Sequence, residues 1–325
     1  MLPGSNITFS ELIEWYLELD PVKGLSSFRR IEVAFSNFDD FFGKMRVRET
    51  IPLNLENYQV WRAKKGAAPA TIDMELSLAA TMVNKAFDND LVDGHAIKSF
   101  RRVKRRLKPG SNARTRVVSV SEYLKLTAIA PPHLKAIIKT AFNTGMRLGE
   151  ILNLRWQHVD KENSYIRLPY GFSKEKKPKN IPINTHVEDL IRKIPRGINH
   201  DFVFTYKGKP IAECGIKRSF RTACLNAKIP YGRKCLNGTT FHDIRRTVKT
   251  NMLAAGLDKA HRDKILGHTL KGMDVHYLNP SEDSLKKAMQ VYTEWLDEKI
   301  AESQKVLTKP LTKNENSLQQ DAVGY

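Results

Sequence analysis

Apolar residues recur every three or four positions through the first part of the chain, as in helices that bury one face. We predict four helices over residues 7–92. The first opens with a capping box formed by Thr8 and Glu11, and Gly43 and Gly66 stand where the second and third should end. The predicted helices begin near Thr8, Ser26, Asn54 and Pro69. This pattern indicates a small helical domain.

A second helical region covers residues 121–156, where we predict two helices. The later one contains Gly145 and Gly149 within an otherwise apolar stretch, and each glycine costs up to roughly 1 kcal/mol there. This cost indicates a close backbone approach or a turn that aims Arg147, which lies between them. Arg147 and Glu150 are three residues apart, so they also fit a plain ion pair on a solvent-exposed face.

The pattern changes to strands at Ser164. We predict one strand over 165–168, a turn around Gly171 and a second strand over 180–183. The tip between them is rich in lysine, which is usual for a solvated loop or a loose phosphate contact.

Helices return after these strands. We predict a helix, a short apolar segment at 202–204 and a further helix from Glu213. The last predicted helix runs over 281–304. Its Tyr292 and Trp295 need a surface to bury against, which is either their own domain or a neighbouring protomer.

The order of elements predicts a mainly α fold with a small antiparallel β-sheet, an α+β class. A chain of 325 residues is long enough for two domains with their own cores. We predict a helical domain at 1–100, a basic linker at 101–118, a second domain at 119–300 and a disordered tail at 301–325.

The charge balance points to a partner. The net charge is +19, so an anionic polymer or surface is expected. The chain has no run of 18 apolar residues and no signal peptide, so we expect no membrane partner. Three cysteines without a Cys-x-x-Cys pair favour a reduced, cytoplasmic compartment without a structural metal.

The predicted linker carries much of this charge. No acidic residue occurs between Gly94 and Ser121, and Pro109 and Gly110 break any helix there. Such a run is usually a solvated tail when it lies at a terminus. Nine cations between two domains fit a strap along a phosphate backbone better. They are Lys98, Arg101, Arg102, Lys104, Arg105, Arg106, Lys108, Arg114 and Arg116.

Further basic surface is predicted on the helix over 213–226 and in the loop over 231–234. We interpret it as contacts to the same phosphate backbone, with a core helix that carries solvated charges as the alternative for 213–226. The residues are Lys217, Arg218, Arg221 and Arg233.

The most informative stretch begins at Thr240. Thr240 and Asp243 form a capping-box pattern at the start of a helix. His242 and Arg245 lie three residues apart on one face of that helix, beside its apolar stripe. Gly256 is placed to end the helix. Taken alone, such a pair is most often a solvated His and Arg on a surface helix.

The next helix should be capped by Asp258 and close at Gly267. His268 then stands just past a helix end, and Tyr277 follows nine residues later. Each of these residues has an ordinary interpretation as a polar group at a helix end or on a surface. Their combination in this order, with an arginine motif upstream, is specific.

This combination consists of His-x-x-Arg, Leu-Gly-His and a tyrosine, with Thr-Gly-x-Arg-x-x-Glu upstream at 144–150. With it the chain resembles the tyrosine recombinases, the phage-integrase family of DNA strand-exchange enzymes. The resemblance is clear over 119–297 and weaker over 7–110. It implies a helical core-binding (SAM-like) first domain and a catalytic second domain.

The resemblance also implies roles. Arg147 and Arg245 would bind the non-bridging oxygens of a DNA phosphate, because guanidinium forks make charge-assisted bonds that strengthen as charge develops. His242 would transfer the phenol proton and His268 would donate to a phosphate oxygen. Tyr277 would attack and end as a 3′-phosphotyrosyl ester.

Two supporting assignments complete the predicted site. Glu150 would orient Arg147. The family places its catalytic lysine in the strand-connecting tip, where residue-by-residue matching favours Lys174 as the proton donor to the leaving 5′-oxygen. The nearby alternatives are Lys176, Lys177 and Lys179.

This chemistry needs neither metal nor ATP, so we expect no cofactor. The expected function is site-specific recombination that integrates or excises a mobile element. The expected partners are double-stranded DNA recombination sites and further copies of the chain in a homo-tetramer on DNA, with room for accessory DNA-bending proteins. We expect a bacterial or phage-encoded, nucleoid-associated protein.

Two other functions fit the same residues. One is a type IB topoisomerase-like strand transferase, and the other is a DNA-binding module without catalysis. The chain begins directly with the helical region, so we expect no separate arm-binding domain before it.

Overall fold

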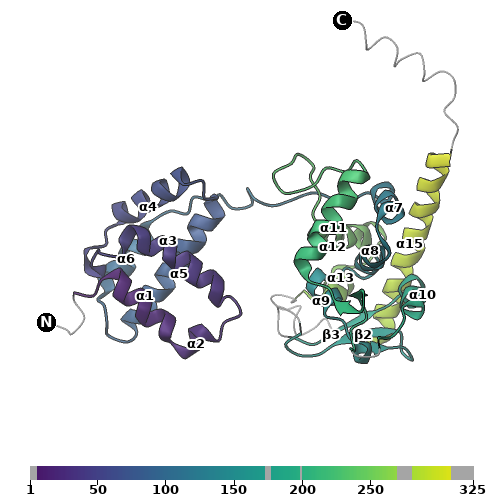
Figure 1. Ribbon diagram of the computed structural model, residues 1–325, viewed down its shortest axis with the longest axis horizontal. Helices are drawn as coiled ribbons and strands as arrows, with labels where there is room; N and C mark the ends of the chain where they lie inside the picture. The colour runs from purple at the N-terminus through teal and green to yellow at the C-terminus, as the bar shows by residue number, and fades with distance from the viewer. Residues whose placement is uncertain (1–5, 173–176, 198–199, 269–279, 309–325) are drawn as a thin grey trace, which may run out of the picture. The chain divides into compact units, whose positions relative to one another are not determined.

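A computed structural model gives the fold. The chain forms two compact units, Met1–Arg114 and Thr115–Tyr325 (Figure 1). Each unit has its own hydrophobic core. Among the described residues no helix is both long and apolar enough to cross a membrane. The structure describes residues 6–172, 177–197, 200–268 and 280–308.

The first unit is a bundle of helices around an aromatic core. Phe38 lies at its centre, with ring centroids 5.3 Å from Phe9 and 5.2 Å from Tyr58, both in edge-to-face contact. The helices are α1 (Phe9–Glu18), α2 (Asp20–Lys23), α3 (Phe28–Phe42), α4 (Pro52–Lys64), α5 (Pro69–Phe87) and α6 (Gly94–Arg102), with a 3-10 turn at Val47–Glu49.

α6 was not among the predicted helices, and it extends two residues into the predicted linker at 101–118. Asp93 caps the helix by accepting a hydrogen bond from the backbone of His95. Ala96 and Ile97 are buried in the core of the first unit. The helix-breaking residues that motivated the linker lie further along, so the extended part of the chain begins after Arg102.

Helices surround α8 in the second unit (Figure 1). The capping box predicted at Thr240 is present, since the Asp243 carboxylate accepts hydrogen bonds from its backbone N–H and its hydroxyl, both at 2.8 Å. The helices are α7 (Val120–Ile129), α8 (Pro132–Thr144), α9 (Leu148–Leu152), α10 (Thr185–Lys193), α11 (Glu213–Asn226), α12 (Phe241–Ala254), α13 (Lys259–Leu266) and α15 (Glu282–Thr308), with a 3-10 turn at Trp156–His158.

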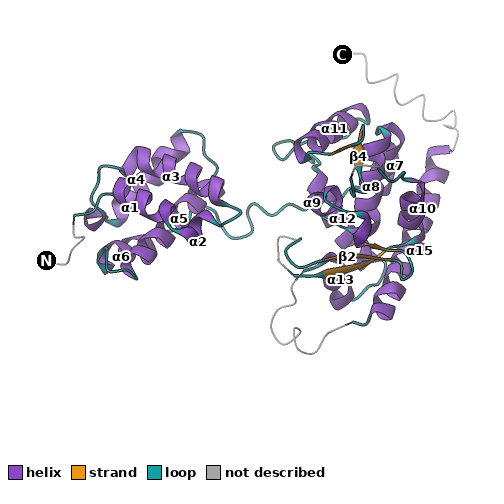
Figure 2. Ribbon diagram, turned by 60° about the horizontal axis from the view of Figure 1, so that its bottom comes forward, coloured by secondary structure: helices purple, strands orange, loops and turns teal. Residues whose placement is uncertain are grey.

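A three-stranded antiparallel sheet, in the order β1-β2-β3, completes this unit. Its strands are β1 (Val159–Asp160), β2 (Tyr165–Leu168) and β3 (Lys179–Pro182). α13 and α15 pack against β3 (Figure 2). The mainly α fold with a small antiparallel sheet is therefore confirmed, and the first predicted strand has the predicted bounds. The second begins one residue early, which takes Lys179 out of the tip and pairs it with Leu168.

Three further details differ from the prediction. α2 is a short helix that was not among the four predicted over residues 7–92. Residues 121–156 contain three helices because Gly145 ends α8 in a left-handed conformation with φ +66°. After the predicted segment at 202–204 the chain forms a small hairpin. Its strands are β4 (Thr205–Tyr206) and β5 (Lys209–Pro210).

The last helix, α15, packs on its own unit. Tyr292 is fully buried and its hydroxyl donates to the carbonyl of Phe142 at 2.8 Å, and Trp295 stacks beside it. The tail predicted to be disordered from residue 301 is helical as far as Thr308. The rest of that prediction lies outside the described residues.

Candidate active site

The pair formed by Arg147 and Glu150 depends on the reversal between α8 and α9. A Cβ at Gly145 would lie 2.3 Å from Cδ2 of Leu266, so only glycine allows the end of α13 to approach here. Two residues later Arg147 is the N-cap of α9. The Glu150 carboxylate accepts from the Arg147 backbone N–H at 3.0 Å and from its Nη1 at 2.8 Å. The guanidinium is thereby fixed by its own turn.

Arg245, on α12, is held by backbone carbonyls. Its Nη1 donates to the carbonyl of Gly145 at 2.6 Å and its Nη2 donates to the carbonyl of Leu266. These carbonyls lie at the C-terminal ends of α8 and α13, where the helix dipole is negative and stabilises a cation. Arg245 is 6% exposed, so its positive charge is buried where α8, α12 and α13 meet.

Lys179 joins this cluster from the sheet. Its Nζ lies 3.1 Å from Oε2 of Glu150, and both side chains are buried. Burial lowers the pKa of Lys179, with Glu150 opposing that change. Burial alone would raise the pKa of Glu150, but the charge of Lys179 and the bonds from Arg147 outweigh it, so its pKa is lowered. Glu150 is therefore a carboxylate shared by two cations.

The two histidines lie at helix ends. His242 stands in the first turn of α12, and burial lowers its pKa, with further lowering by Arg246 and Arg245. His268 follows the left-handed Gly267 that ends α13. Burial, then the charge of Arg245, lowers the pKa of His268 as well. Both imidazoles are therefore neutral near neutral pH and can exchange a proton or donate one N–H.

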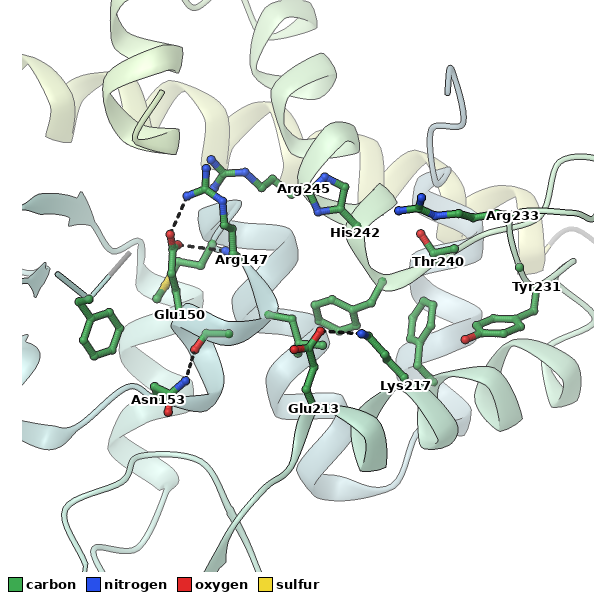
Figure 3. Close-up of a pocket in the computed structure, with 17 residues that line it drawn as sticks. Arg147, Glu150, Asn153, Glu213, Lys217, Tyr231, Arg233, Thr240, His242 and Arg245 are labelled. Carbon is green, nitrogen blue, oxygen red and sulfur yellow. Dashed lines mark hydrogen bonds and ion pairs between the residues drawn. The ribbon is translucent and has the colours of Figure 1, made fainter. Parts of the chain in front are cut away.

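A cavity of about 850 Å³ opens beside these residues. Arg147, Glu150, His242 and Arg245 line it, and Figure 3 shows the Arg245, Arg147 and Glu150 side chains gathered at one end, with His242 nearby. Arg233 and the ion pair of Lys217 with Glu213 line other parts of the cavity. The cavity is therefore cationic, and an anion with several oxygens suits it.

The structure thus brings together four predicted site residues in one cavity, with His268 close to Arg245. Lys174 and Tyr277 lie outside the described residues. Among the alternatives for the catalytic lysine, Lys177 is exposed and Lys179 belongs to the cluster with Glu150, while Lys176 is also outside the described residues.

Two further residues at the site were not predicted. The side chains of Lys249 and Asp263 contact Nδ1 of His268, both at 3.2 Å. Lys249 lies one helical turn after Arg245, so its spacing alone could have placed it on the same side of α12. Asp263 has no comparable signal, because its contact depends on how α13 packs against α12.

The predicted phosphate strap is partly anchored on the first unit. Oδ1 of Asp73 accepts from the backbone N–H of Arg106 and Oδ2 from that of Leu107, each at 2.9 Å, and Gln59 donates to the carbonyl of Lys104 at 2.9 Å. The backbone is held while the cationic side chains remain exposed. These exposed side chains are Arg101, Arg102, Lys104, Arg105 and Arg106.

The other predicted cations differ in accessibility. Arg116 makes its contacts within the second unit, where it donates to Thr239 at 3.0 Å and forms an ion pair with Glu122. These contacts favour a structural role for Arg116. Arg114 is half-buried. The exposed residues are Lys217, Arg218, Arg221 and Arg233.

The sequence of this chain is similar to those of known recombinases. A family model described as Phage integrase family matches residues 116–284. A shufflon-specific DNA recombinase of Escherichia coli is 24% identical over 77% of this chain and 60% of its own length. Tyrosine recombinase XerC of Staphylococcus epidermidis is 26% identical over 47% of this chain and 51% of its own length. The chain thus spans between about half and three-fifths of these curated relatives.

Solved structures share the fold at low sequence identity. A lambda integrase dimer bound to a COC′ core site matches with TM-score 0.67 at 14% identity, over 81% of this chain and 96% of that one. The Tn1549 transposon integrase in complex with circular intermediate DNA matches with TM-score 0.62 at 18% identity, over 87% of this chain and 99% of that one.

Proposed function

The chain belongs to the phage integrase family, and we propose that it is a site-specific tyrosine recombinase. It cleaves and rejoins duplex DNA through a 3′-phosphotyrosyl intermediate, and so integrates or excises a mobile element. A type IB topoisomerase-like activity uses similar chemistry on a single duplex, so the substrate requirement separates the two.

The observation that carries this proposal is the pre-organised pair of guanidiniums. Arg147 is fixed by Glu150, and Arg245 is fixed by two helix-end carbonyls, so the protein itself holds both guanidiniums in place. Both line the same cavity as His242. Donors that are already aligned need no reorganisation as charge builds on a phosphate oxygen, which is the main source of transition-state stabilisation in such sites.

The proposed reaction is a phosphoryl transfer from the 5′-oxygen of the DNA to the phenol oxygen of Tyr277. The phenol oxygen of Tyr277 forms a bond to the phosphorus, and the bond from phosphorus to the 5′-oxygen breaks. His242 takes the phenol proton, and Lys174 gives a proton to the leaving 5′-oxygen. Arg147 and Arg245 stabilise the non-bridging oxygens. Attack by a 5′-hydroxyl reverses these steps and rejoins the strand.

The remaining cations would hold the duplex. The exposed strap over 101–106 and the cationic face of α11 give sequence-independent phosphate contacts, each of which releases counterions. A lambda integrase tetramer bound to a Holliday junction has the same fold, with TM-score 0.67. By analogy the active assembly of this chain is a homo-tetramer on two recombination sites in the cytoplasm.

The test uses suicide DNA, whose cleaved fragment diffuses away and traps the ester. The full chain should give a covalent protein–DNA complex that survives denaturing electrophoresis. The Tyr277→Phe variant should bind the same DNA and give no such complex. A covalent complex from that variant would refute Tyr277 as nucleophile.

A second arm separates recombinase from topoisomerase. Exchange between two site-bearing duplexes supports recombination, whereas relaxation of supercoiled DNA without exchange supports the topoisomerase-like activity. Binding without any covalent complex would leave a non-catalytic DNA-binding module.

A further inference from the structure

Three polar side-chain atoms form a closed triangle at Nδ1 of His268. Nζ of Lys249 lies 3.2 Å from Nδ1, and Oδ1 of Asp263 also lies 3.2 Å from it. Nζ of Lys249 is in turn 2.9 Å from Oδ1 of Asp263. An ammonium and a carboxylate therefore compete for the same ring nitrogen.

The fold holds this triangle in place. Lys249 follows Arg245 by one turn on α12, while Asp263 is buried on α13. Gly267 then reverses the chain with φ +68°, so that the His268 backbone N–H donates to the carbonyl of Asp263 at 2.7 Å. The imidazole is thereby fixed against the last turn of α13.

Two hydrogen-bonding arrangements are possible at Nδ1 of His268. An ammonium only donates and a carboxylate only accepts, whereas Nδ1 of a neutral imidazole does one or the other. If Nδ1 carries the proton it donates to Asp263, and Nε2 is a bare acceptor. If Nδ1 is bare it accepts from Lys249, and Nε2 carries the proton. Lys249 and Asp263 therefore determine which ring nitrogen of His268 carries the proton and can donate it to a ligand.

The surrounding charges favour the second arrangement. Among the described residues, the charged groups that act on the ring are Arg245 and Lys249 from α12 and Asp263 from α13. The carboxylate of Asp263 is already paired with Lys249, and with Lys259 at 3.5 Å. A further hydrogen bond from the ring N–H would therefore stabilise this carboxylate less. A bare Nδ1 next to the two cations is then the lower-energy choice.

We propose that Lys249 is a positioning residue that fixes His268 as the tautomer protonated at Nε2. Lys249 donates to Nδ1 and to Asp263, and the Nε2–H of a neutral ring donates to a non-bridging oxygen of the scissile phosphate. This inference rests on the proposed function, because that phosphate is the ligand of Nε2.

Removal of the ammonium reverses the tautomer. In Lys249→Met, Asp263 is the remaining partner of Nδ1 in the triangle and takes its N–H, so a bare Nε2 repels the phosphate oxygen. The ring then donates from Nε2 only as an imidazolium. That form exists below the pKa of His268 and is lost as pH rises through it.

The functional test is the pH dependence of single-turnover cleavage of suicide DNA. We expect K249M to be about 100-fold slower than the unaltered chain in alkaline buffer, the cost typical of one lost donor to a developing oxyanion. The ratio of the two rates should rise toward one as pH falls. K249R keeps a donor and should restore the rate. A ratio that does not change with pH overturns the proposal.

A matched control removes the other lysine beside Asp263. Lys259→Met takes away a cation 3.5 Å from Oδ2 of Asp263, without touching the contact from Lys249 to the ring. It should keep the unaltered rate and pH profile. A loss equal to that of K249M would assign the effect to the charge on Asp263 and refute the tautomer.

Nitrogen-15 NMR of the histidine-labelled full chain measures the tautomer without DNA, and His268→Gln assigns the signal. We expect the Nε2–H form in the unaltered chain and in K259M, and the Nδ1–H form in K249M. The same tautomer in all three refutes the role of Lys249. This measurement does not need catalysis, so a chain that cleaves no DNA would refute the proposed function alone.

Discussion

Glu150→Gln should destabilise the second unit more than Lys179→Met, although both changes break the same ion pair. Both side chains are buried, with Nζ of Lys179 3.1 Å from Oε2 of Glu150. In E150Q the lysine stays buried without its carboxylate. In K179M the glutamate keeps the two hydrogen bonds from Arg147, at 2.8 and 3.0 Å.

The two costs follow from this asymmetry. Removing one partner so that a buried charge is left uncompensated costs about 3–5 kcal/mol, which we expect for E150Q. In K179M an apolar chain fills the same space and the remaining carboxylate is still paired, so about 1–2 kcal/mol is expected. The double variant should lie close to K179M, because removing the lysine relieves the defect in E150Q.

The assay is denaturant unfolding followed by tryptophan fluorescence. Trp15 and Trp61 belong to the first unit, and Trp156 and Trp295 to the second. A Trp15→Phe, Trp61→Phe background therefore limits the signal to the second unit. Equal losses in E150Q and K179M, or a double variant whose loss is the sum of the two, would refute the assignment of Glu150 as the carboxylate that compensates a buried lysine.

Other predictions concern binding and catalysis. Arg147→Lys should slow cleavage about 100-fold in the suicide-DNA assay, because one ammonium cannot replace a bidentate fork; near-normal cleavage would contradict this. If neutral His242 is the proton acceptor, cleavage should fall only below about pH 6.5, since its pKa is lowered; loss above that value would contradict the role. Asp73→Ala should weaken DNA binding roughly tenfold, because it frees the strap backbone. The slope of the logarithm of the binding constant against the logarithm of the salt concentration should not change. Arg106→Ala should reduce that slope by about 0.9, and a reduced slope in D73A would refute anchoring.

Local signals predicted the elements around the site well. The caps of α12 and α13 and the glycine that closes α13 involve residues a few positions apart, so sequence spacing suffices to find them. α6 was not predicted because its basic composition, followed by the helix breakers Pro109 and Gly110, indicated a linker. Ala96 and Ile97, which the structure buries, gave a weaker signal for a helix. Its stability comes from packing against the first unit, which local propensity does not contain.

The site residues that sequence did not reveal depend on long-range packing. Lys179 was grouped with solvated lysines of the tip, but its pairing with Leu168 directs it to Glu150. The contact between Lys249 and Asp263 joins two helices whose crossing no local pattern specifies. By contrast, Arg147 and Glu150 interact within one turn, so their pairing was predictable.

The central claim, that Arg147 and Arg245 act on the non-bridging oxygens of one phosphate, is tested most directly by changing that oxygen. Single-turnover cleavage is measured on a phosphate and on a neutral methylphosphonate at the scissile position, with the unaltered chain and with Arg147→Ala and Arg245→Ala. The account predicts that each variant loses most of its activity on the phosphate and far less on the methylphosphonate, where less charge needs stabilising. Equal losses on both substrates would contradict it.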